Sequence, residues 1–129
     1  MIHTAVIDTN IIVSSILSVY GKPAEVMNLV YTGELRMFYT AEILTEYKKV
    51  LAYSRLNIAK GTQTDIVNAL EVGGTLIKAP QSTIMFPDEN DRVFYDTAKA
   101  SRSILITGNL KHYPMESFIM NPDDFLHRM

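Results

Sequence analysis

The alternation of apolar and polar residues along the chain predicts short strands separated by helices. The segment HTAVID, residues 3–8, is an apolar run rich in β-branched residues, which is typical of a strand buried on both faces. Comparable runs predict further strands at 36–39, 75–77, 103–107 and 117–120. Helical spacing predicts helices at 11–17, 24–32, 41–52, 62–72 and 91–101, and another after 121–122. Strands that alternate with helices indicate a parallel sheet covered on both faces, an α/β fold.

Single residues set several of the expected helix ends. Pro23 suits the first position of a helix, and Gly33 suits the C-terminal stop of the same helix. Thr40 is suited to cap the helix that follows it. Thr62, with Asp65 three residues later, resembles a capping box and predicts that a helix begins there.

Composition narrows the classes of function. The chain has 129 residues without a linker, repeat or low-complexity block, so residues 1–129 are expected to form one domain. The absence of cysteine excludes a disulfide framework, a zinc finger and a thiol nucleophile.

The balance of 12 Lys and Arg against 14 Asp and Glu argues against a broad basic surface, so any nucleic-acid contact should be local, transient or metal-assisted. No signal-like or membrane-spanning run is present, and we expect a cytoplasmic protein.

Polar residues that follow predicted strands are the first candidates for chemistry, because open α/β sheets bind ligands beyond the carboxyl ends of their strands. Asp8 follows the first strand, and Asn109 follows the strand at 103–107. If these two strands are neighbours, the two side chains converge. The alternative for Asp8 is an ordinary helix cap, which the residue type suits equally well.

Two further carboxylates interrupt apolar helix faces. Glu46 flanks the apolar stripe of the helix at 41–52, and its alternative is a surface pair with Lys49. Asp91 shares the buried stripe of its helix, so it either caps the helix or faces a site where a cation or backbone amides compensate its charge. Asp96 falls on the opposite side of that helix and, like Arg92, is expected on the solvated surface.

Asp8, Glu46 and Asp91 come from a strand end, a helix flank and a helix start, so they can meet at one crevice. Carboxylates gathered there repel one another, and a hard divalent cation relieves that repulsion. Mg²⁺ and Mn²⁺ favour such oxygen ligands, and they can activate water for phosphoester hydrolysis. The three acids together therefore point to phosphodiester or phosphomonoester hydrolysis.

Four segments carry a resemblance to a known family: AVIDTNIIVSSIL, EILTEYKKVL, PDENDRVFYDTAKA and LITGNLKHYP. Their order and spacing resemble those of PIN-domain proteins, and in particular the VapC-type toxins of toxin–antitoxin modules. The resemblance implies a three-layer α/β/α sandwich around a central parallel sheet and a metal-dependent ribonuclease centre. The positions that match the family pattern are the three core acids Asp8, Glu46 and Asp91, the supporting Asn10, and the hydroxyl residue Thr107.

Asn109 departs from the family pattern, since many PIN domains place a fourth acid there. An asparagine can orient a water or offer a carbonyl oxygen, but it adds no negative charge. We therefore expect the site to hold one Mg²⁺ or Mn²⁺ firmly and a second only with substrate, with Asn109 positioning water or the scissile phosphate. For His112, which follows closely, packing in the loop is expected over a role as general acid or RNA contact.

The implied function is hydrolysis of single-stranded RNA by the toxin of a toxin–antitoxin module, with a protein antitoxin as partner and a homodimer as the assembly. Val26, Met27 and Val30 share a helical face that is core by default, although PIN toxins commonly contact antitoxins through N-terminal helices. Two alternatives stay open. One is a PIN-like binding or scaffold domain without turnover. The other is a different Mg²⁺-dependent phosphohydrolase, although Asn10 stands where a haloacid-dehalogenase-type phosphatase would have its second Asp, and no Gly-rich phosphate loop is present.

Overall fold

A central sheet of five strands organises the molecule in the computed structural model, which describes residues 3–129. The strands are β1 (His3–Ile7), β2 (Leu35–Tyr39), β3 (Gly74–Leu76), β4 (Ile104–Ile106) and β5 (Ile119–Met120). Their spatial order is β3-β2-β1-β4-β5, and every neighbouring pair is parallel. The parallel sheet expected from the alternating pattern is confirmed.

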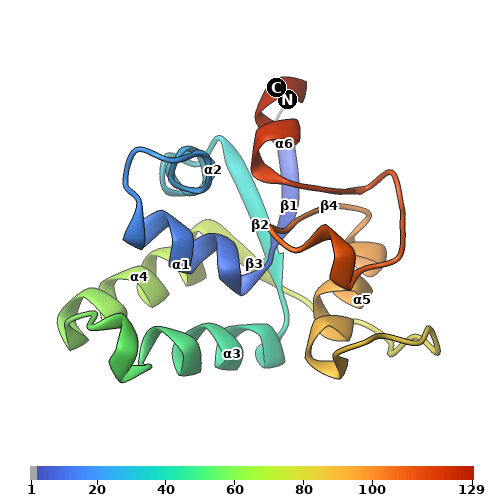
Figure 1. Ribbon diagram of the computed structural model, residues 1–129, viewed down its shortest axis with the longest axis horizontal. Helices are drawn as coiled ribbons and strands as arrows, with labels where there is room; N and C mark the ends of the chain where they lie inside the picture. Colours follow the sequence, from blue (N-terminus) through green and yellow to red (C-terminus); the bar gives the residue numbers. More distant parts are fainter. Residues whose placement is uncertain (1–2) are drawn as a thin grey trace.

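Helices cover both faces of this sheet (Figure 1). They are α1 (Thr9–Leu17), α2 (Lys22–Tyr31), α3 (Ala41–Leu51), α4 (Lys60–Gly73), α5 (Arg92–Ser101) and α6 (Pro122–Arg128). Figure 1 shows α1, α2 and α4 on one side of the sheet and α5 on the other, while α3 passes beyond the carboxyl ends of the strands. Single 3-10 turns occur at η1 (Ser54–Leu56), η2 (Glu89–Asp91) and η3 (Leu110–His112). The fold is therefore the three-layer α/β/α sandwich that the family resemblance implied.

Several helix ends follow the residues that predicted them, and one does not. The hydroxyl of Thr40 accepts a hydrogen bond from the amide of Ile43 at 3.2 Å, and Gly33 has a φ of +83° just beyond α2. The expected start of a helix at Thr62 is wrong, because α4 already begins at Lys60. Gln63, inside the expected capping box, instead donates its side-chain amide to the carbonyl of Ile58 at 2.8 Å. That bond fixes the chain before the helix, so the start does not depend on a hydroxyl cap.

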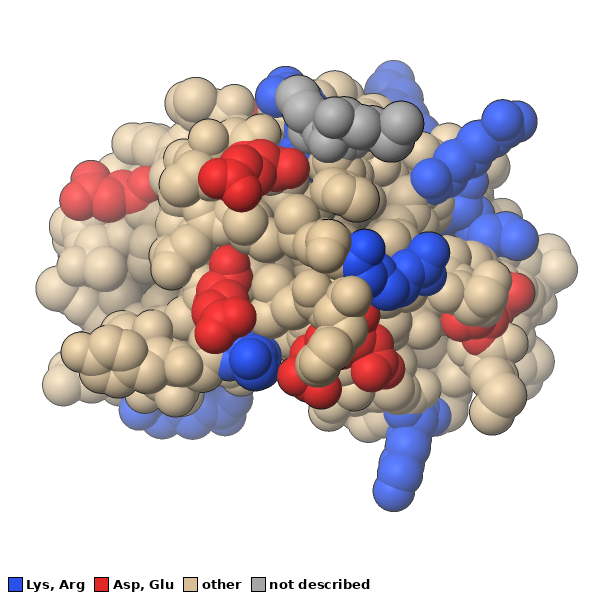
Figure 2. Space-filling view, turned by 90° about the horizontal axis from the view of Figure 1, so that it is seen from above, with Lys and Arg blue, Asp and Glu red and all other residues tan. Residues whose placement is uncertain are grey.

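Charged side chains are mixed on the surface. Acidic and basic groups are interspersed on the face drawn in Figure 2, and no continuous basic surface covers that face. Within residues 3–129, no helix is long and apolar enough to cross a membrane. Electrostatic attraction of a nucleic acid to the face in Figure 2 would therefore be local.

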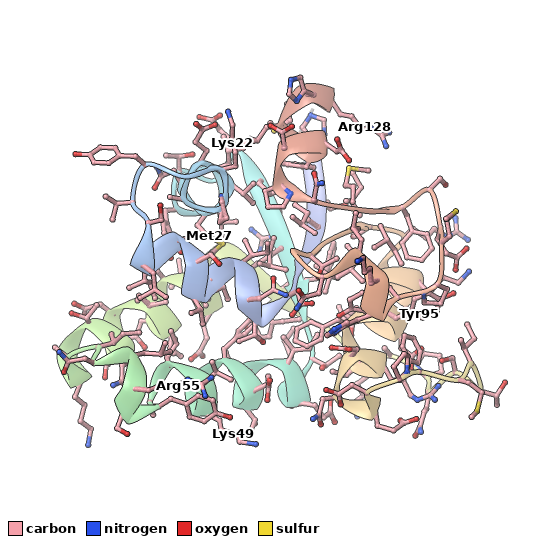
Figure 3. All side chains as sticks on the ribbon, viewed as in Figure 1. Lys22, Met27, Lys49, Arg55, Tyr95 and Arg128 are labelled. Atoms are coloured by element: carbon pink, nitrogen blue, oxygen red, sulfur yellow. The ribbon has the colours of Figure 1, made fainter. Side chains whose placement is uncertain are left out.

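The core lies between the sheet and its two helical layers. Residues Ala5 to Ile7 of β1 are fully buried, as expected for a central parallel strand. Val26, Met27 and Val30 of α2 are buried as well, with Met27 packed on the α1 side of the sheet (Figure 3). This face of α2 is therefore part of the chain's own core, and it is not available to an antitoxin.

Candidate active site at the carboxyl ends of the central strands

The direction of chain connection reverses between β1 and β4. From β1 the chain continues to β2 and β3 on one side, whereas β4 and β5 lie on the other. Ile7 is in register with Ile106, and the amide of Asp8 donates to the carbonyl of Ile106 at 3.0 Å. The residues that follow these two strands therefore meet at a topological switch point, where open α/β sheets form ligand crevices. The condition for Asp8 and Asn109 to converge, that their strands are neighbours, is therefore met.

Asp8 is a buried carboxylate that faces this switch point. It occupies the N-cap position of α1, yet its side chain makes no capping hydrogen bond. Instead, Oδ2 accepts the hydroxyl of Thr107 at 2.8 Å and the hydroxyl of Tyr113 at 2.9 Å. In the described part of the chain, no hydrogen bond ends on its other oxygen, Oδ1. Of the two readings open from the sequence, the geometry favours a site residue over a helix cap.

Two tyrosines that no sequence motif singles out lie beside Asp8. Tyr113 is buried, and both burial and the nearby charge of Asp8 raise the pKa of its phenol. Tyr47 is fully buried and donates its hydroxyl to the carbonyl of Ile7, and burial, followed by the charge of Asp8, raises its pKa too. Both phenols therefore stay protonated and act as donors. The only sequence signal for Tyr113 is its place in the LKHYP run after β4.

The loop after β4 is joined to α1 through side chains. Thr107 is fully buried, and its hydroxyl oxygen also accepts the amide of Asn109 at 3.0 Å. Asn10 accepts the amide of Gly108 on its Oδ1 at 3.1 Å. The side chain of Asn109 is exposed, and Asn109 is connected to Asp8 through its backbone and Thr107, not by direct contact.

Asp91 is the second carboxylate at the site. It ends η2 directly before α5 and makes no side-chain cap, so it too is not a capping residue. Its Oδ2 is buried and accepts no hydrogen bond, but it lies 3.3 Å from Nδ1 of His112, with which it forms an ion pair when that histidine is protonated. Burial, then the charges of Asp8 and Asp88, raise the pKa of Asp91 to about 6. A carboxylate in this position gains from a nearby positive charge.

His112 is therefore more than a loop-packing residue. Its side chain is 49% exposed and stands against a 14% exposed Asp91, so it lies at the rim of the site. The sequence showed no partner for this histidine, because the two residues are brought together only by the fold.

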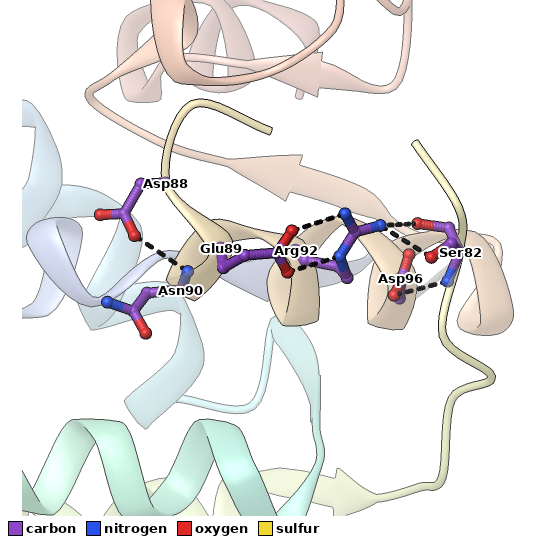
Figure 4. Close-up of polar contacts among 6 residues, drawn as sticks. All are labelled: Ser82, Asp88, Glu89, Asn90, Arg92 and Asp96. Carbon is purple, nitrogen blue, oxygen red and sulfur yellow. Dashed lines mark hydrogen bonds and ion pairs between the residues drawn. The ribbon is translucent and has the colours of Figure 1, made fainter. Parts of the chain in front are cut away.

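A network of polar contacts holds the turn that carries Asp91 (Figure 4). The guanidinium of Arg92 donates to both carboxylate oxygens of Glu89 at 2.8 Å, and to the carbonyl of Ser82 at 2.7 Å. Asp96 accepts the amide of Ser82 at 3.0 Å. The expectation that Arg92 and Asp96 are solvated is wrong, because both are buried where the segment 78–88 folds back over α5. These contacts occupy the guanidinium of Arg92 within the chain itself.

Phe86 connects this segment to the site. Its ring lies 5.1 Å from the guanidinium carbon of Arg92 and packs edge-on against the ring of Tyr113, with 6.2 Å between centroids. The segment 78–88 thus supports both Asp91, through Arg92, and Asp8, through Tyr113.

Glu46 lies on α3, one residue before Tyr47, and is half-buried. It forms no ion pair with Lys49 among the residues that the structure describes. Across residues 3–129, no three His, Cys, Asp or Glu side chains stand close enough to form a ligand set by themselves. Mg²⁺, however, is commonly held by one or two carboxylates together with waters and substrate phosphates. Asp8, whose Oδ1 accepts no hydrogen bond, and Asp91, whose pKa is raised in part by the charge of Asp8, are the two carboxylates that would hold such a cation.

Comparisons with known proteins give the site a family context. Residues 4–111 match the family model described as PIN domain. An uncharacterised protein of the archaeon Methanocaldococcus jannaschii is 25% identical over 107 residues, which cover 81% of this chain and 69% of that protein. The matched family segment contains Asp8, Glu46 and Asp91, and the switch point between β1 and β4.

Proposed function

The chain belongs to the PIN-domain family, whose members are generally nucleases, and on that premise we propose that it is a divalent-cation-dependent endoribonuclease acting on single-stranded RNA. Nuclease chemistry on a nucleic acid is the activity of the family. The choice of RNA, the single-stranded substrate and the cation are our proposal, and the residues at the switch point support them.

The observation that carries the proposal is a pair of acids with incomplete hydrogen bonding. Oδ2 of Asp91 is buried and accepts no hydrogen bond. Burial and the nearby charge of Asp8 both raise the pKa of Asp91. Burying a carboxylate without a compensating charge costs roughly several kcal/mol of folding free energy, unless a cation or a proton neutralises it. Among the described residues, His112 is the one cationic side chain that pairs with Asp91, at 3.3 Å and only when protonated, and no lysine or arginine does. A divalent cation is the compensation that also provides nuclease chemistry.

Asp8 and Asp91 would hold Mg²⁺ or Mn²⁺, and Glu46 would contribute directly or through a water. Such a cation lowers the pKa of water and neutralises charge that develops on a phosphodiester. The roles of the chain's own residues follow from their contacts. Thr107 and Tyr113 keep Asp8 in one orientation with Oδ1 free, while Asn10 fixes the loop after β4.

Two more residues complete the proposed site. Glu46 would orient the attacking water or accept its proton. Asn109, exposed at the start of η3, would position water or the scissile phosphate through its carboxamide. Because a carboxamide adds no charge, the cation also has to offset the charge of the substrate.

We further propose that this nuclease is the toxin of a toxin–antitoxin module, acts as a homodimer and is inhibited by a protein antitoxin. The resemblance of the four segments to VapC-type toxins supports this assignment. A small DNA-binding protein encoded just upstream, whose addition suppresses RNA cleavage, would support the assignment. Mass measurement in solution tests the dimer.

The nuclease proposal is tested with a mixed pool of single-stranded RNA in Mg²⁺, in Mn²⁺ and in EDTA. Wild type should cleave internally in the presence of either cation and not in EDTA. Asp8→Asn should abolish cleavage, because it removes a charge while both hydroxyl donors keep an acceptor oxygen. Asp65→Asn, the same change at an exposed position of α4, should cleave as wild type does. Equal cleavage by Asp8→Asn would overturn the assignment.

The exposed Asn109, where many PIN domains have an acid, favours a binding or scaffold domain as the second candidate. Thermal stability in Mn²⁺, measured together with RNA cleavage, distinguishes the scaffold from the nuclease. A scaffold that retains the cation would gain thermal stability from Mn²⁺ in wild type and not in Asp8→Ala, yet would cleave no RNA.

A further inference from the structure

A groove lies between α1, the first residues of α2 and α6, and the loop that follows β4. It has a volume of about 320 Å³ and a largely apolar lining, in which the polar side chains are those of Asn10, Ser14, Lys22, Asn109, Asn121 and Asp123. Asn10 lies two residues after Asp8, and Asn109 two residues after Thr107. Two residues span at most about 7 Å of extended chain, so this groove begins next to the proposed cleavage site. Its volume is within the range of pockets that hold small ligands.

Two carboxamides in the groove are held in fixed orientations by their own hydrogen bonds. Asn10 accepts the amide of Gly108 at 3.1 Å, and Asn121 accepts the amide of Asp124 at 2.8 Å. In both, the oxygen is occupied and the NH₂ group is left with its two donors. The groove therefore offers preorganised donors, which match a ligand edge that carries acceptor atoms.

The charges of the groove do not favour a phosphate as that ligand. Lys22 stands between α2 and α6 (Figure 3), but its ammonium lies 3.8 Å from a carboxylate oxygen of Glu25. Asp123 adds a negative charge to the lining. Pro23 and Pro122 provide apolar ring surfaces beside the amides. Neutral acceptors flanked by a flat apolar face are the chemistry of a nucleobase, whose edge carries carbonyl and ring-nitrogen acceptors.

We propose that this groove binds one unpaired nucleobase of the RNA strand, next to the phosphodiester that lies at Asp8 and Asp91. The inference rests on the proposed ribonuclease function and adds to it a source of sequence preference. Asn10 and Asn121 donate to acceptor atoms on the edge of the base, and Pro23 and Pro122 contact its face. Cleavage is then favoured beside bases whose acceptors fit these two amides.

The test is an NMR titration of ¹⁵N-labelled protein in EDTA, which removes any contribution from the cation. Adenosine, cytidine, guanosine and uridine are added separately, and inorganic phosphate is a fifth probe. At least one nucleoside should shift the side-chain NH₂ signals of Asn10 and Asn121 and the backbone amides of 108–109. Phosphate alone should leave these signals unchanged. No shift with any nucleoside, or equal shifts with phosphate, would overturn the proposal.

A variant pair tests whether the donors matter. Asn121→Asp keeps the oxygen that caps α6 but loses both donors, so nucleoside binding should weaken about tenfold. Asn28→Asp makes the same change at an exposed position of α2 outside the groove and should bind as wild type does. Unchanged binding by Asn121→Asp, or equal weakening in both variants, would refute the donor role.

A cleavage assay separates failure of this inference from failure of the proposed function. RNA oligomers that differ by one base beside the cut should be cleaved unequally by wild type and more equally by Asn121→Asp. Cleavage without base preference, combined with no nucleoside shifts, overturns the groove and leaves the nuclease standing. Nucleoside shifts without cleavage of any RNA overturn the nuclease and leave a nucleoside site.

Discussion

Tyr113 donates its phenol hydroxyl to Oδ2 of Asp8 at 2.9 Å, across a separation of 105 residues. The first acid of the site is therefore oriented by a loop from near the other end of the chain. Because Phe86 packs against Tyr113, the segment 78–88 supports the same contact. The geometry of Asp8 consequently depends on three segments that only the folded state brings together.

Replacing Tyr113 with phenylalanine should destabilise the fold and weaken the site. The variant keeps the buried ring but removes a hydrogen bond to a carboxylate, which costs about 1–3 kcal/mol of unfolding free energy. Urea unfolding measures the loss, and RNA cleavage should fall because Asp8 is less fixed. Tyr20→Phe is the control, since Tyr20 is 96% exposed and should unfold as wild type does. Equal stability of the two variants would contradict the role of Tyr113.

The elements that could be predicted from the sequence are those fixed by local patterns. The strand at 3–7 is a buried apolar run, and Thr40 caps α3, because strand burial and capping depend on residues close in the chain. The start of α4 differs from the position that Thr62 predicts, because the helix begins at Lys60 and the chain before it is held by the hydrogen bond from Gln63 to the carbonyl of Ile58. Local competition of this kind leaves no clear pattern.

The part of the candidate site at the ends of β1 and β4 could be predicted, because an alternating α/β pattern makes these two strands neighbours in the sheet. Asp8 and Thr107 meet once β1 and β4 are neighbours, and a parallel α/β pattern makes that arrangement a reasonable expectation. The partnership of Tyr113 with Asp8 and the burial of Asp96 depend instead on how loops fold back. Loop paths are set by tertiary contacts, which have no periodic signature in sequence.

Arg92→Lys should loosen the segment 78–88. A lysine cannot donate to both oxygens of Glu89 and to Ser82 at once, because it lacks the planar fork of arginine. Limited proteolysis should cut this segment severalfold faster in the variant, and the cation-dependent activity should fall with it. Arg128→Lys, at an exposed position of α6, should be cut at the wild-type rate. If the two variants are cut alike, the network does not hold the segment.

Gly74→Ala should destabilise the sheet edge at β3. A Cβ there would lie 2.8 Å from Cε1 of Tyr39, 2.9 Å from Cγ of Met37 and 3.0 Å from the carbonyl oxygen of Leu70. Overpacking of this kind costs about 1–3 kcal/mol. Gly61→Ala is the matched control, because a Cβ there meets nothing within 4 Å and helix propensity should stabilise α4 by up to about 1 kcal/mol. Thermal unfolding should move in opposite directions for the two variants.

Asp91→Asn should stabilise the protein at alkaline pH in EDTA. The pKa of Asp91 is raised from 3.8 to about 6, first by burial and then by Asp8 and Asp88, so folding favours its protonated form. Wild type therefore loses unfolding free energy as the pH rises from 4 through 6, and the neutral asparagine does not. In urea unfolding at pH 8 the variant should have a free energy of unfolding higher than wild type by on the order of 1 kcal/mol, with no difference at pH 4.

Added Mn²⁺ should reduce this difference in unfolding free energy at pH 8, because it stabilises wild type alone. A gap independent of pH, or the same gap in Asp65→Asn, would show that the carboxylate of Asp91 carries no such penalty.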